Sequence, residues 1–498
     1  MANPTTDAHG GPSLNPTTVS PFRSDEVRGI TIAGIVAALV IVGAGSLVRP
    51  GPGPSWVWGG AVVEVGAWGH VWRVVSWLGV VALVVAWARL VRLSGRSPLA
   101  VPTAARIVAW WAVPFALGPT LFSNDVSSYV AQGQIVARGL DPFSVGPDVL
   151  GRAPIVHMVS PIWAHTPAPY GPVWLWLDGA ISAVTGQRVT PSIVLLRLVA
   201  ILSVMVIGWC LVRLARHYDA DPGRVLVVGL ANPLVLFHFV SGAHNEALMS
   251  ALLLVGLLLA VTERPILGII VVGLAASVKI PAAAGLLVIG WGMAGTAAPL
   301  HRKLLSTALA TLGGLGVVAL ASEVTGFGFG WIHALNEAGR VRGLESPSGA
   351  AALIVAQLDT GLGHPWSVAT LLTIGRLLGL AAAAVAATVL IMRGRHAVAI
   401  VSLGAALLAA FLLSPTIQPW YIAAPVALMA FTSKDWKLAV VVTVGVAYGL
   451  MTLPSGGGIL FLTGAAGPWF VPVLAAGFIA WQWRLKPLRD RRRADLAA

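Results

Sequence analysis

The sequence predicts an all-α membrane protein whose helices cross the bilayer many times. Of its 498 residues, 57% are hydrophobic and only 10% are charged, whereas about 25% of the residues of an ordinary soluble protein are charged. The apolar residues fall in runs of roughly 15 to 26, and about 20 apolar residues span a bilayer as a helix. A soluble enzyme of this length could not bury so much apolar surface in one core.

The apolar runs divide the chain into three parts. Residues 1–28 are polar and are expected to be a disordered cytoplasmic N-terminus, 29–481 a transmembrane domain, and 482–498 a basic cytoplasmic tail. No small-residue cleavage pattern follows the first run, which therefore predicts a spanning helix rather than a signal peptide. The expected spans, about 13 to 14 in number, are 29–48, 74–93, 107–122, 193–212, 225–240, 246–261, 266–278, 280–294, 304–323, 366–391, 397–413, 418–432, 438–453 and 459–481. The 266–294 pair can also be one broken helix.

Basic residues orient this array of helices. The net charge is +13, and an N-terminus in the cytoplasm places most of the 32 Lys and Arg in cytoplasmic segments, as the positive-inside rule requires. Both termini of this plasma (inner) membrane protein are therefore expected in the cytoplasm. Because topology accounts for the charge, and because no RNA-binding signature or zinc spacing is present, no nucleic acid is expected as a partner.

Two long loops are expected on the outer face, at 123–172 and 324–365. After the first, residues 173–185 are apolar, but a crossing there would move the basic loop around Arg213 to the outside. We therefore expect a re-entrant or interfacial helix, for which Pro172, Asp178 and Gly186 are suited, anchored by Trp174 and Trp176 at the headgroup level. Within the spans, Arg376 is the one deeply placed charge that we identify, and we expect it to face the bundle or a lipid headgroup.

Asp125 begins the first outer loop, in "LFSNDVSSYVAQGQIVARGLDPF". Ser123 or Asn124 can cap a helix that ends near Arg138, with Gly139 as its C-terminal stop. In one interpretation Asp125 only stabilises the first turn of this helix, which is worth about 0.3–1 kcal/mol. In the other, its carboxylate is a general base at the boundary between lipid and water.

The rest of this loop is rich in proline, aromatic and ionisable residues, which indicates a folded segment rather than a simple connector. Other outer junctions carry polar groups in "SGAHNEAL", "ASVKIPAAAGLL" and "SPTIQPWYIAAP". Lys279, in the second of these, can hold a phosphate as a point charge. Polar turns and aromatic belts are common at membrane interfaces, so a purely structural role stays open for each junction.

These segments together resemble a known family. "SNDVSSYVAQGQIVARGLDPFSVGPDVLG", "SPIWAHTPAPYGPVW", "SGAHNEAL" and "SPTIQPWY" are similar to the actinobacterial polyprenol-phosphate-mannose-dependent α-(1→6)-mannopyranosyltransferases that build the lipomannan and lipoarabinomannan backbone. That family belongs to the GT-C class of membrane glycosyltransferases. The resemblance covers about residues 100–480 and implies a GT-C-type helical bundle.

The resemblance also implies a reaction. Mannose would move from a polyprenyl-phosphate-mannose donor to the 6-hydroxyl of a mannan or lipomannan acceptor on the extracytoplasmic face, with inversion, no cofactor and no metal. Asp125 matches the family's proposed catalytic base, although Asn124 stands where many GT-C enzymes have a second acid. The residues that would contact the donor phosphate or sugar are Lys279, Arg138, Arg152, His165, Tyr170, His244, Asn245, Glu246, Gln418, Trp420 and Tyr421.

Several alternatives stay open at this point. A GT-C transferase of another sugar, arabinofuranose or glucose, would carry the same residue types. A secondary transporter would need paired ionisable groups and broken helices near the bilayer midplane, and a noncatalytic scaffold would tolerate loss of Asp125. The sequence indicates neither the oligomeric state nor the acceptor length, nor whether the proximal or the distal part of the backbone is extended.

Overall fold

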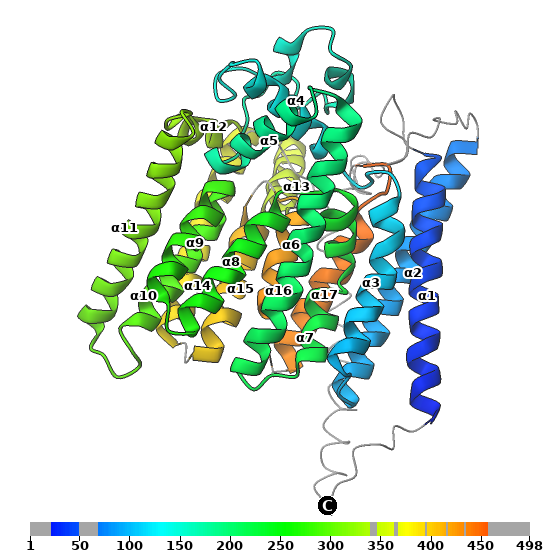
Figure 1. Cartoon of the computed structure of the whole chain (residues 1–498), viewed down its shortest axis with the longest axis vertical. Helices are drawn as coiled ribbons and strands as arrows, with labels where there is room; N and C mark the ends of the chain where they lie inside the picture. The colour runs from blue at the N-terminus through cyan, green and yellow to red at the C-terminus, as the bar shows by residue number, and fades with distance from the viewer. Residues whose placement is uncertain are drawn as a thin grey trace, which may run out of the picture.

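The computed structural model describes residues 21–48, 68–338, 346–362, 367–393, 396–414, 417–432 and 435–456. In these ranges the chain is a bundle of helices with no β-strand. Figure 1 shows the bundle standing upright, with helices α4 (Asp125–Ala137) and α5 (Pro172–Val184) in a cap at one end. The all-α class predicted from the sequence is confirmed.

The first three helices form one side of the bundle. They are α1 (Pro21–Ser46), α2 (Gly69–Arg96) and α3 (Val101–Leu117), and α1 packs against both others. The indole of Trp111 crosses α1 closely, donating to the Thr31 carbonyl at 3.0 Å. Because α1 begins at Pro21, the prediction that residues 21–28 are disordered is wrong.

The central helices follow the predicted spans closely. They are α6 (Val189–His217), α7 (Pro222–Gly229), η4 (Val235–Ser241), α8 (Glu246–Val261), α9 (Pro265–Val278), η5 (Ile280–Ala283), α10 (Ala284–Met293) and α11 (Leu300–Val324). Helices α8 and α9 pack closely because a Cβ on Gly256 would lie only 2.9 Å from the Gly268 carbonyl oxygen. Small residues at such a crossing are how membrane helices approach each other.

Three predicted spans are broken rather than continuous. In 225–240, α7 ends at Gly229 and the π-helical η4 begins at Val235, because Pro233 cannot donate and the Asn232 side chain accepts the Leu234 amide at 2.9 Å. In 280–294, η5 precedes α10. In 418–432, η6 (Pro419–Ile422) precedes α16 (Ala423–Met429).

The later part of the chain completes the bundle. It contains α12 (Gly330–Ala338), α13 (Pro347–Leu362), α14 (Val368–Arg393), α15 (His396–Leu413) and α17 (Asp435–Met451). The predicted outer loop 324–365 therefore contains two helices, α12 and α13. The predicted span 459–481, the tail 482–498, residues 1–20 and the side chain of Arg376 lie outside what the structure describes.

The predicted outer loop 123–172 is folded, as expected, and contains α4 and the short helices η2 (Pro147–Leu150) and η3 (Pro154–Met158). The apolar segment after it forms α5, which packs along α4. At their contact, Cβ atoms on Gly133 and Gly179 would lie only 2.3 Å from α5 and α4 atoms respectively. Trp176 is 55% exposed, but Trp174 is buried, so its predicted role as an interfacial anchor is wrong.

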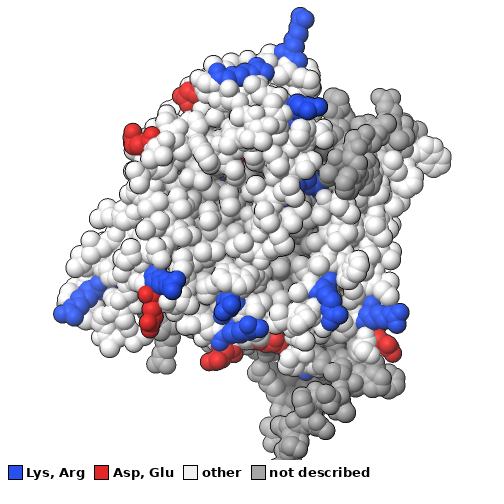
Figure 2. Space-filling model, in the orientation of Figure 1, with Lys and Arg blue, Asp and Glu red and all other residues white. Residues whose placement is uncertain are grey.

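The outer surface fits a bilayer. Figure 2 shows almost all Lys, Arg, Asp and Glu of this face at the cap and along the opposite edge, with an uncharged band between them. Among the described helices, α1, α2, α6 and α11 are long and apolar enough to cross a membrane, giving four spans, or five if η4 and α8, bent by 106°, are one span. Leu202, Met205 and Trp209 leave an exposed apolar stripe on α6. The protein is an all-α polytopic membrane protein.

Candidate active site

Ionisable and aromatic side chains from five segments meet where the cap lies on the bundle. Asp125 comes from the start of α4, and His244 and Glu246 from the junction between η4 and α8. Lys279 follows α9 and pairs with Glu246. The rings that surround these groups come from the cap loop and from η6, and are Tyr170, Trp420 and Tyr421.

Asp125 is positioned by a strained turn. Phe122 has a φ of 70°, which is rare for a residue with a side chain, and its ring stacks on Phe237 with centroids 4.3 Å apart. Packing therefore holds the turn in place. The Ser123 hydroxyl accepts the Asp125 amide at 3.0 Å, and α4 then begins. The side chain of Asp125 is 14% exposed, so it is largely buried but still accessible from the outside.

A second strained turn positions His244. Ala243 has a φ of 52°, and the imidazole of His244 is fully buried and stacked on Trp420 with centroids 4.1 Å apart. Its Nδ1 lies 3.5 Å from Asp125 Oδ2 and 3.9 Å from Glu246 Oε2. His244 therefore stands between the two carboxylates. Strained non-glycine turns of this kind cluster at functional sites.

Lys279 and Glu246 form a buried ion pair, with Nζ donating to Oε1. The ammonium also lies 4.4 Å from the centre of the Tyr421 ring and 5.7 Å from that of Tyr170. Aromatic faces attract cations through the ring quadrupole. The side chain of Lys279 is 15% exposed, so one side of it is open to an additional anion.

The cap meets the bundle beside this pair through backbone contact. The Gly171 amide donates to the Val278 carbonyl at 3.1 Å. A Cβ on Gly171 would lie 2.1 Å from the Ser277 carbonyl oxygen, so only glycine fits there. This close approach places Tyr170 over Lys279.

The surroundings of Asp125 and His244 shift the pKa values of both side chains. Burial and, after it, the charge of Glu246 raise the pKa of Asp125 to about 7, while Lys279 and the Ser123 hydroxyl lower it in part. Burial, together with His238 and Lys279, lowers the pKa of His244 well below its ordinary value. A carboxylate that titrates near neutral pH is suited to general-base catalysis, and the neighbouring imidazole is neutral.

The structure brings most of the predicted site residues together. Asp125, Tyr170, His244, Glu246, Lys279, Trp420 and Tyr421 form the cluster just described. Asn245 is buried beside it, and its backbone N–H donates to the Tyr129 hydroxyl at 3.4 Å. Gln418 precedes η6 at the edge of the cluster.

Three predicted residues lie on the outside of the cap instead. Arg138 donates to the Gln187 side chain at 3.1 Å, and His165 lies 2.9 Å from Asp148 with 80% of its side chain exposed. Arg152 is exposed between η2 and η3. Their predicted contact with donor phosphate or sugar remains a prediction that the geometry does not favour.

Arg197 of α6 was not predicted to be a buried charge or a site residue. This residue is 3% exposed, and its guanidinium donates to the carbonyls of Phe115 and Gly118 at the end of α3 and to that of Ser241. It thereby ties together the two turns that carry Asp125 and His244. Arg197 is thus a second charge within a predicted span, beside Arg376, whose side chain lies outside the described residues. An arginine four residues into a predicted span was the available signal.

Two further buried ionisable residues, His238 and Asp178, were not among the predicted site residues. His238 of η4 lies against His244, with ring centroids 5.6 Å apart, and an imidazole inside an apolar run was its signal. Asp178 of α5 is 2% exposed, and burial raises its pKa well above the ordinary value. Asp178 is therefore a buried carboxyl in the contact between α4 and α5. Among the described residues, no His, Cys, Asp or Glu side chains converge as a metal site.

A large cavity lies at the opposite end of the same helices. Its volume is about 860 Å³, and it is lined by the C-terminal ends of α6, α8 and α10 and by the starts of α9, α11 and α15. None of the clustered residues lines it. The cavity is therefore separate from the Asp125 cluster.

Comparison with known proteins identifies the family of the chain. Residues 31–295 match the family model for the α-(1→6)-mannopyranosyltransferase N-terminal domain, and residues 347–483 match the MptB C-terminal domain. The chain is 34% identical to α-(1→6)-mannopyranosyltransferase A of Mycobacterium tuberculosis over 72% of this chain and 70% of the relative. It is 30% identical to α-(1→6)-mannopyranosyltransferase A of Corynebacterium glutamicum over 83% of this chain and 89% of the relative.

Another relative, α-(1→6)-mannopyranosyltransferase B of Corynebacterium glutamicum, is 29% identical over 76% of this chain and 68% of its own length. No solved structure matches the chain. The family resemblance drawn from the outer-loop motifs is confirmed by these matches, which extend through both halves of the bundle. The chain belongs to the α-(1→6)-mannopyranosyltransferase family and is a membrane glycosyltransferase that transfers mannose.

Proposed function

We propose that the protein transfers mannose from polyprenyl-phosphate-mannose to the 6-hydroxyl of a mannan or lipomannan acceptor, with Asp125 as the general base. One observation carries this proposal: Asp125, whose pKa is raised to about 7, lies in one buried cluster with the cation Lys279. Such a site holds a proton acceptor and a phosphate-binding charge close together. The printed names of the relatives support the α-(1→6) linkage.

The proposed step is a single displacement. The Asp125 carboxylate takes the proton of the acceptor 6-hydroxyl as that oxygen forms a bond to the anomeric carbon of mannose. The bond from this carbon to the donor phosphate breaks on the opposite face, and polyprenyl phosphate leaves with the electron pair. A β-linked donor thereby gives an α-linked product.

Lys279 would stabilise the leaving phosphate. Preorganised charges at the position where negative charge develops are among the largest contributions to catalysis. In the structure the ammonium is already paired with Glu246 and lies against two aromatic rings. The donor phosphate would therefore bind at the remaining open side of Lys279, and Glu246 would hold the ammonium in place.

His244 would keep the base oriented. Its Nδ1 is 3.5 Å from Asp125, a distance that small side-chain movement can shorten to a hydrogen bond in the substrate complex. A neutral imidazole with a proton on Nδ1 can donate to the Asp125 carboxylate. Stacking on Trp420 fixes the plane of the ring.

The side of the membrane follows from the basic residues. We assign both termini and the loops around Arg92, Arg213 and Arg302 to the cytoplasm, and with this topology the cluster would lie on the extracytoplasmic face. The chain also has one Asp-x-Asp sequence, Asp219–Asp221, at the opposite end. There the Asp221 side chain accepts the Gly223 amide at 2.9 Å and caps α7, which favours a structural role over binding of a nucleotide sugar.

Substitution of Asp125 by Asn tests the proposal. We expect a loss of about 10²–10⁴-fold in the transfer rate, the usual effect of removing a general base, with little change in the melting temperature. Labelled polyprenyl-phosphate-mannose and a defined α-(1→6)-mannan would be incubated with purified protein in liposomes, and the product linkage analysed. Asp148→Asn, an exposed carboxylate on the same cap, is the matched control.

Full activity of Asp125→Asn would exclude Asp125 as the base. Transfer from an arabinofuranosyl or glucosyl lipid phosphate, with none from the mannosyl donor, would instead support the alternative sugar specificities. Movement of the lipid-linked sugar across the membrane without transfer would support a transporter.

A further inference from the structure

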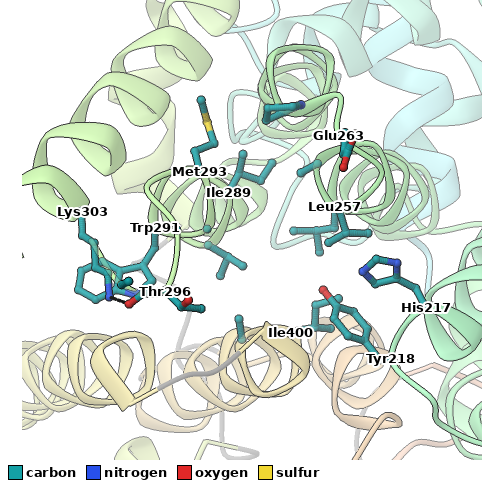
Figure 3. A pocket seen from close by; sticks show the side chains of 18 residues that line it. His217, Tyr218, Leu257, Glu263, Ile289, Trp291, Met293, Thr296, Lys303 and Ile400 are labelled. Atoms are coloured by element: carbon teal, nitrogen blue, oxygen red, sulfur yellow. Dashed lines mark hydrogen bonds between the residues drawn. The ribbon is translucent and has the colours of Figure 1, made fainter. Parts of the chain in front are cut away.

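The cavity at the opposite end from Asp125 has the properties of a second binding site. Its volume of about 860 Å³ lies within the roughly 300–1,000 Å³ that is usual for small-molecule sites. Figure 3 shows Lys303 and Trp291 on one side and His217 and Tyr218 on the other, with Ile289 and Leu257 between them. The lining comes from helices that also carry the outer cluster, since α8 begins at Glu246 and α9 ends beside Lys279.

The inner wall of this cavity is aliphatic. Leu257 of α8, Ile289 of α10 and Ile400 of α15 line it and are 2%, 3% and 1% exposed. These three side chains are packed against protein, and the partly buried apolar residues Ala260, Val261 and Val288 line the open part of the same space. The chemistry of the wall therefore fits a hydrocarbon chain.

The rim of the cavity carries the features of a membrane interface. The ammonium of Lys303 lies 5.4 Å from the centre of the Trp291 ring and donates to the Thr296 carbonyl at 2.9 Å. Tryptophan and lysine side chains are typical of the headgroup level of a bilayer. On the topology proposed above, this rim lies at the cytoplasmic leaflet, whose anionic lipids attract basic residues.

The charges around the mouth favour an anionic occupant. Lys303 lines the cavity, and three exposed arginines adjoin lining residues in sequence, namely Arg216, Arg264 and Arg302. Among the residues that the structure describes, the acidic groups that line this mouth or adjoin a lining residue in sequence are Glu263 and Asp219. The basic C-terminal stretch of this chain, with Arg484 and Lys486, has the wrong charge to fill such a rim.

We propose that this cavity binds one anionic phospholipid of the cytoplasmic leaflet, with an acyl chain along Ala260, Val261 and Val288 and the headgroup phosphate at Lys303. The bound lipid braces α8 and α10 at the end that lies away from the catalytic cluster. This site is independent of the identity of the general base and of the sugar that is transferred.

The test compares two lipids with the same acyl chains, phosphatidylglycerol and phosphatidylcholine. Full-length protein would be equilibrated with each lipid in detergent, and the retained lipid counted by native mass spectrometry. We expect one phosphatidylglycerol to be retained in preference to phosphatidylcholine. Lys303→Gln should weaken phosphatidylglycerol retention about fivefold, the effect of one basic residue near an anionic surface, and leave phosphatidylcholine unchanged.

Arg213→Gln is the matched control. Arg213 lies 5.6 Å from the centre of the Trp209 ring on the outside of α6, so this change removes a similar cation from a similar pair away from the cavity. Filling the inner wall by Ile289→Trp, or by Ala399→Phe on the other side, should abolish retention of both lipids. Two filling variants are used so that one that misfolds, as seen by size-exclusion chromatography, can be set aside.

Three results would overturn the proposal. These are equal retention of the two lipids by the unaltered protein, retention of neither, and an effect of Lys303→Gln no larger than that of Arg213→Gln. Loss of mannosyl transfer in Asp125→Asn has no bearing on any of them, so this proposal and the proposed function fail separately.

Discussion

The two ends of the α8–α9–α10 segment place similar residues in different environments. At the outer end, Glu246 and Lys279 are buried, paired with each other and covered by aromatic rings. At the opposite end, Glu263 and, from the neighbouring helix α11, Lys303 lie around the rim of a cavity with an aliphatic wall. Each end has an acid, a lysine and aromatic side chains, but only the outer one brings the charges into contact inside the protein.

This difference indicates where the protein uses electrostatic energy. A buried ion pair stabilises a fold little, because desolvation of the two charges offsets their attraction. Its presence at the outer end is therefore better explained by function than by stability. Charges that remain at a solvated rim are strongly screened, and they select among lipids rather than stabilise a transition state.

The largest expected effect on this comparison comes from Lys279→Met. We expect kcat/KM for the donor to fall about 10²- to 10³-fold, as happens when one group that stabilises developing charge is removed. Arg213→Gln removes a cation from an aromatic pair at the cytoplasmic end and should leave transfer within about twofold, because surface charges contribute little. The measurement is initial-rate transfer at several donor concentrations.

A control separates binding of phosphate from stability of the fold. Lys279→Met alone leaves Glu246 buried without its partner, which is destabilising. The double variant Glu246→Gln/Lys279→Met removes both charges and should recover the melting temperature but not the transfer rate. Recovery of transfer in the double variant would show that Lys279 serves only to neutralise Glu246.

His244 gives an intermediate effect. His244→Phe keeps a ring against Trp420 but removes the donor beside Asp125, and we expect about a tenfold lower kcat, the worth of one hydrogen bond to a charged group. His244→Asn keeps an amide donor near the position of Nδ1 and should retain more activity than the Phe variant. Higher activity in the Phe variant than in the Asn variant would show that the site needs the ring rather than its proton.

The pH profile tests the electrostatics of the outer end. A general base must be ionised, and the pKa of Asp125 is about 7, so kcat/KM should rise with pH through about 7 and be lost below it. Because Glu246 raises this pKa and Lys279 lowers it, Glu246→Gln should move the acid limb to lower pH, by about one unit. Lys279→Met should move it to higher pH. Shifts in the reverse directions would contradict the assignment of this limb to Asp125.

The smallest expected effect lies on the surface of the cap. Asp148 and His165 are 2.9 Å apart but largely exposed, and exposed ion pairs contribute about 0–1 kcal/mol. Asp148→Asn should therefore change both the transfer rate and the melting temperature very little. A large fall in transfer would mean that this part of the cap contacts the substrate, as the sequence analysis predicted for His165.

The sequence predicted the features that depend on local chemistry. Helix ends were correct to within a few residues for α6, α8 and α9, because apolar runs and prolines mark them directly. Asp125, Glu246 and Lys279 were identified because polar residues at the ends of apolar runs are conspicuous. Their meeting in one cluster depends on packing between distant segments, which hydropathy does not encode.

The same limit explains the errors. Arg197 resembles an ordinary charge near a helix end, and only its contacts with the carbonyls of Phe115 and Gly118 show its structural role. Trp174 has the composition of an interfacial anchor, but it is buried with its ring 5.0 Å from that of Tyr129. For both residues, the residue type allows more than one role, and only the tertiary contacts show which role applies.

A substitution at Gly171 would change the distance between the two sides of the site. It sits where the cap loop lies against the end of α9, with no room for even a β-carbon. One added methyl group there would act as a wedge, forcing the loop that carries Tyr170 away from the helix end that carries Lys279. Larger side chains at Gly171 would thus increase the distance between Tyr170 and Lys279 in small steps, without altering any charged or aromatic group.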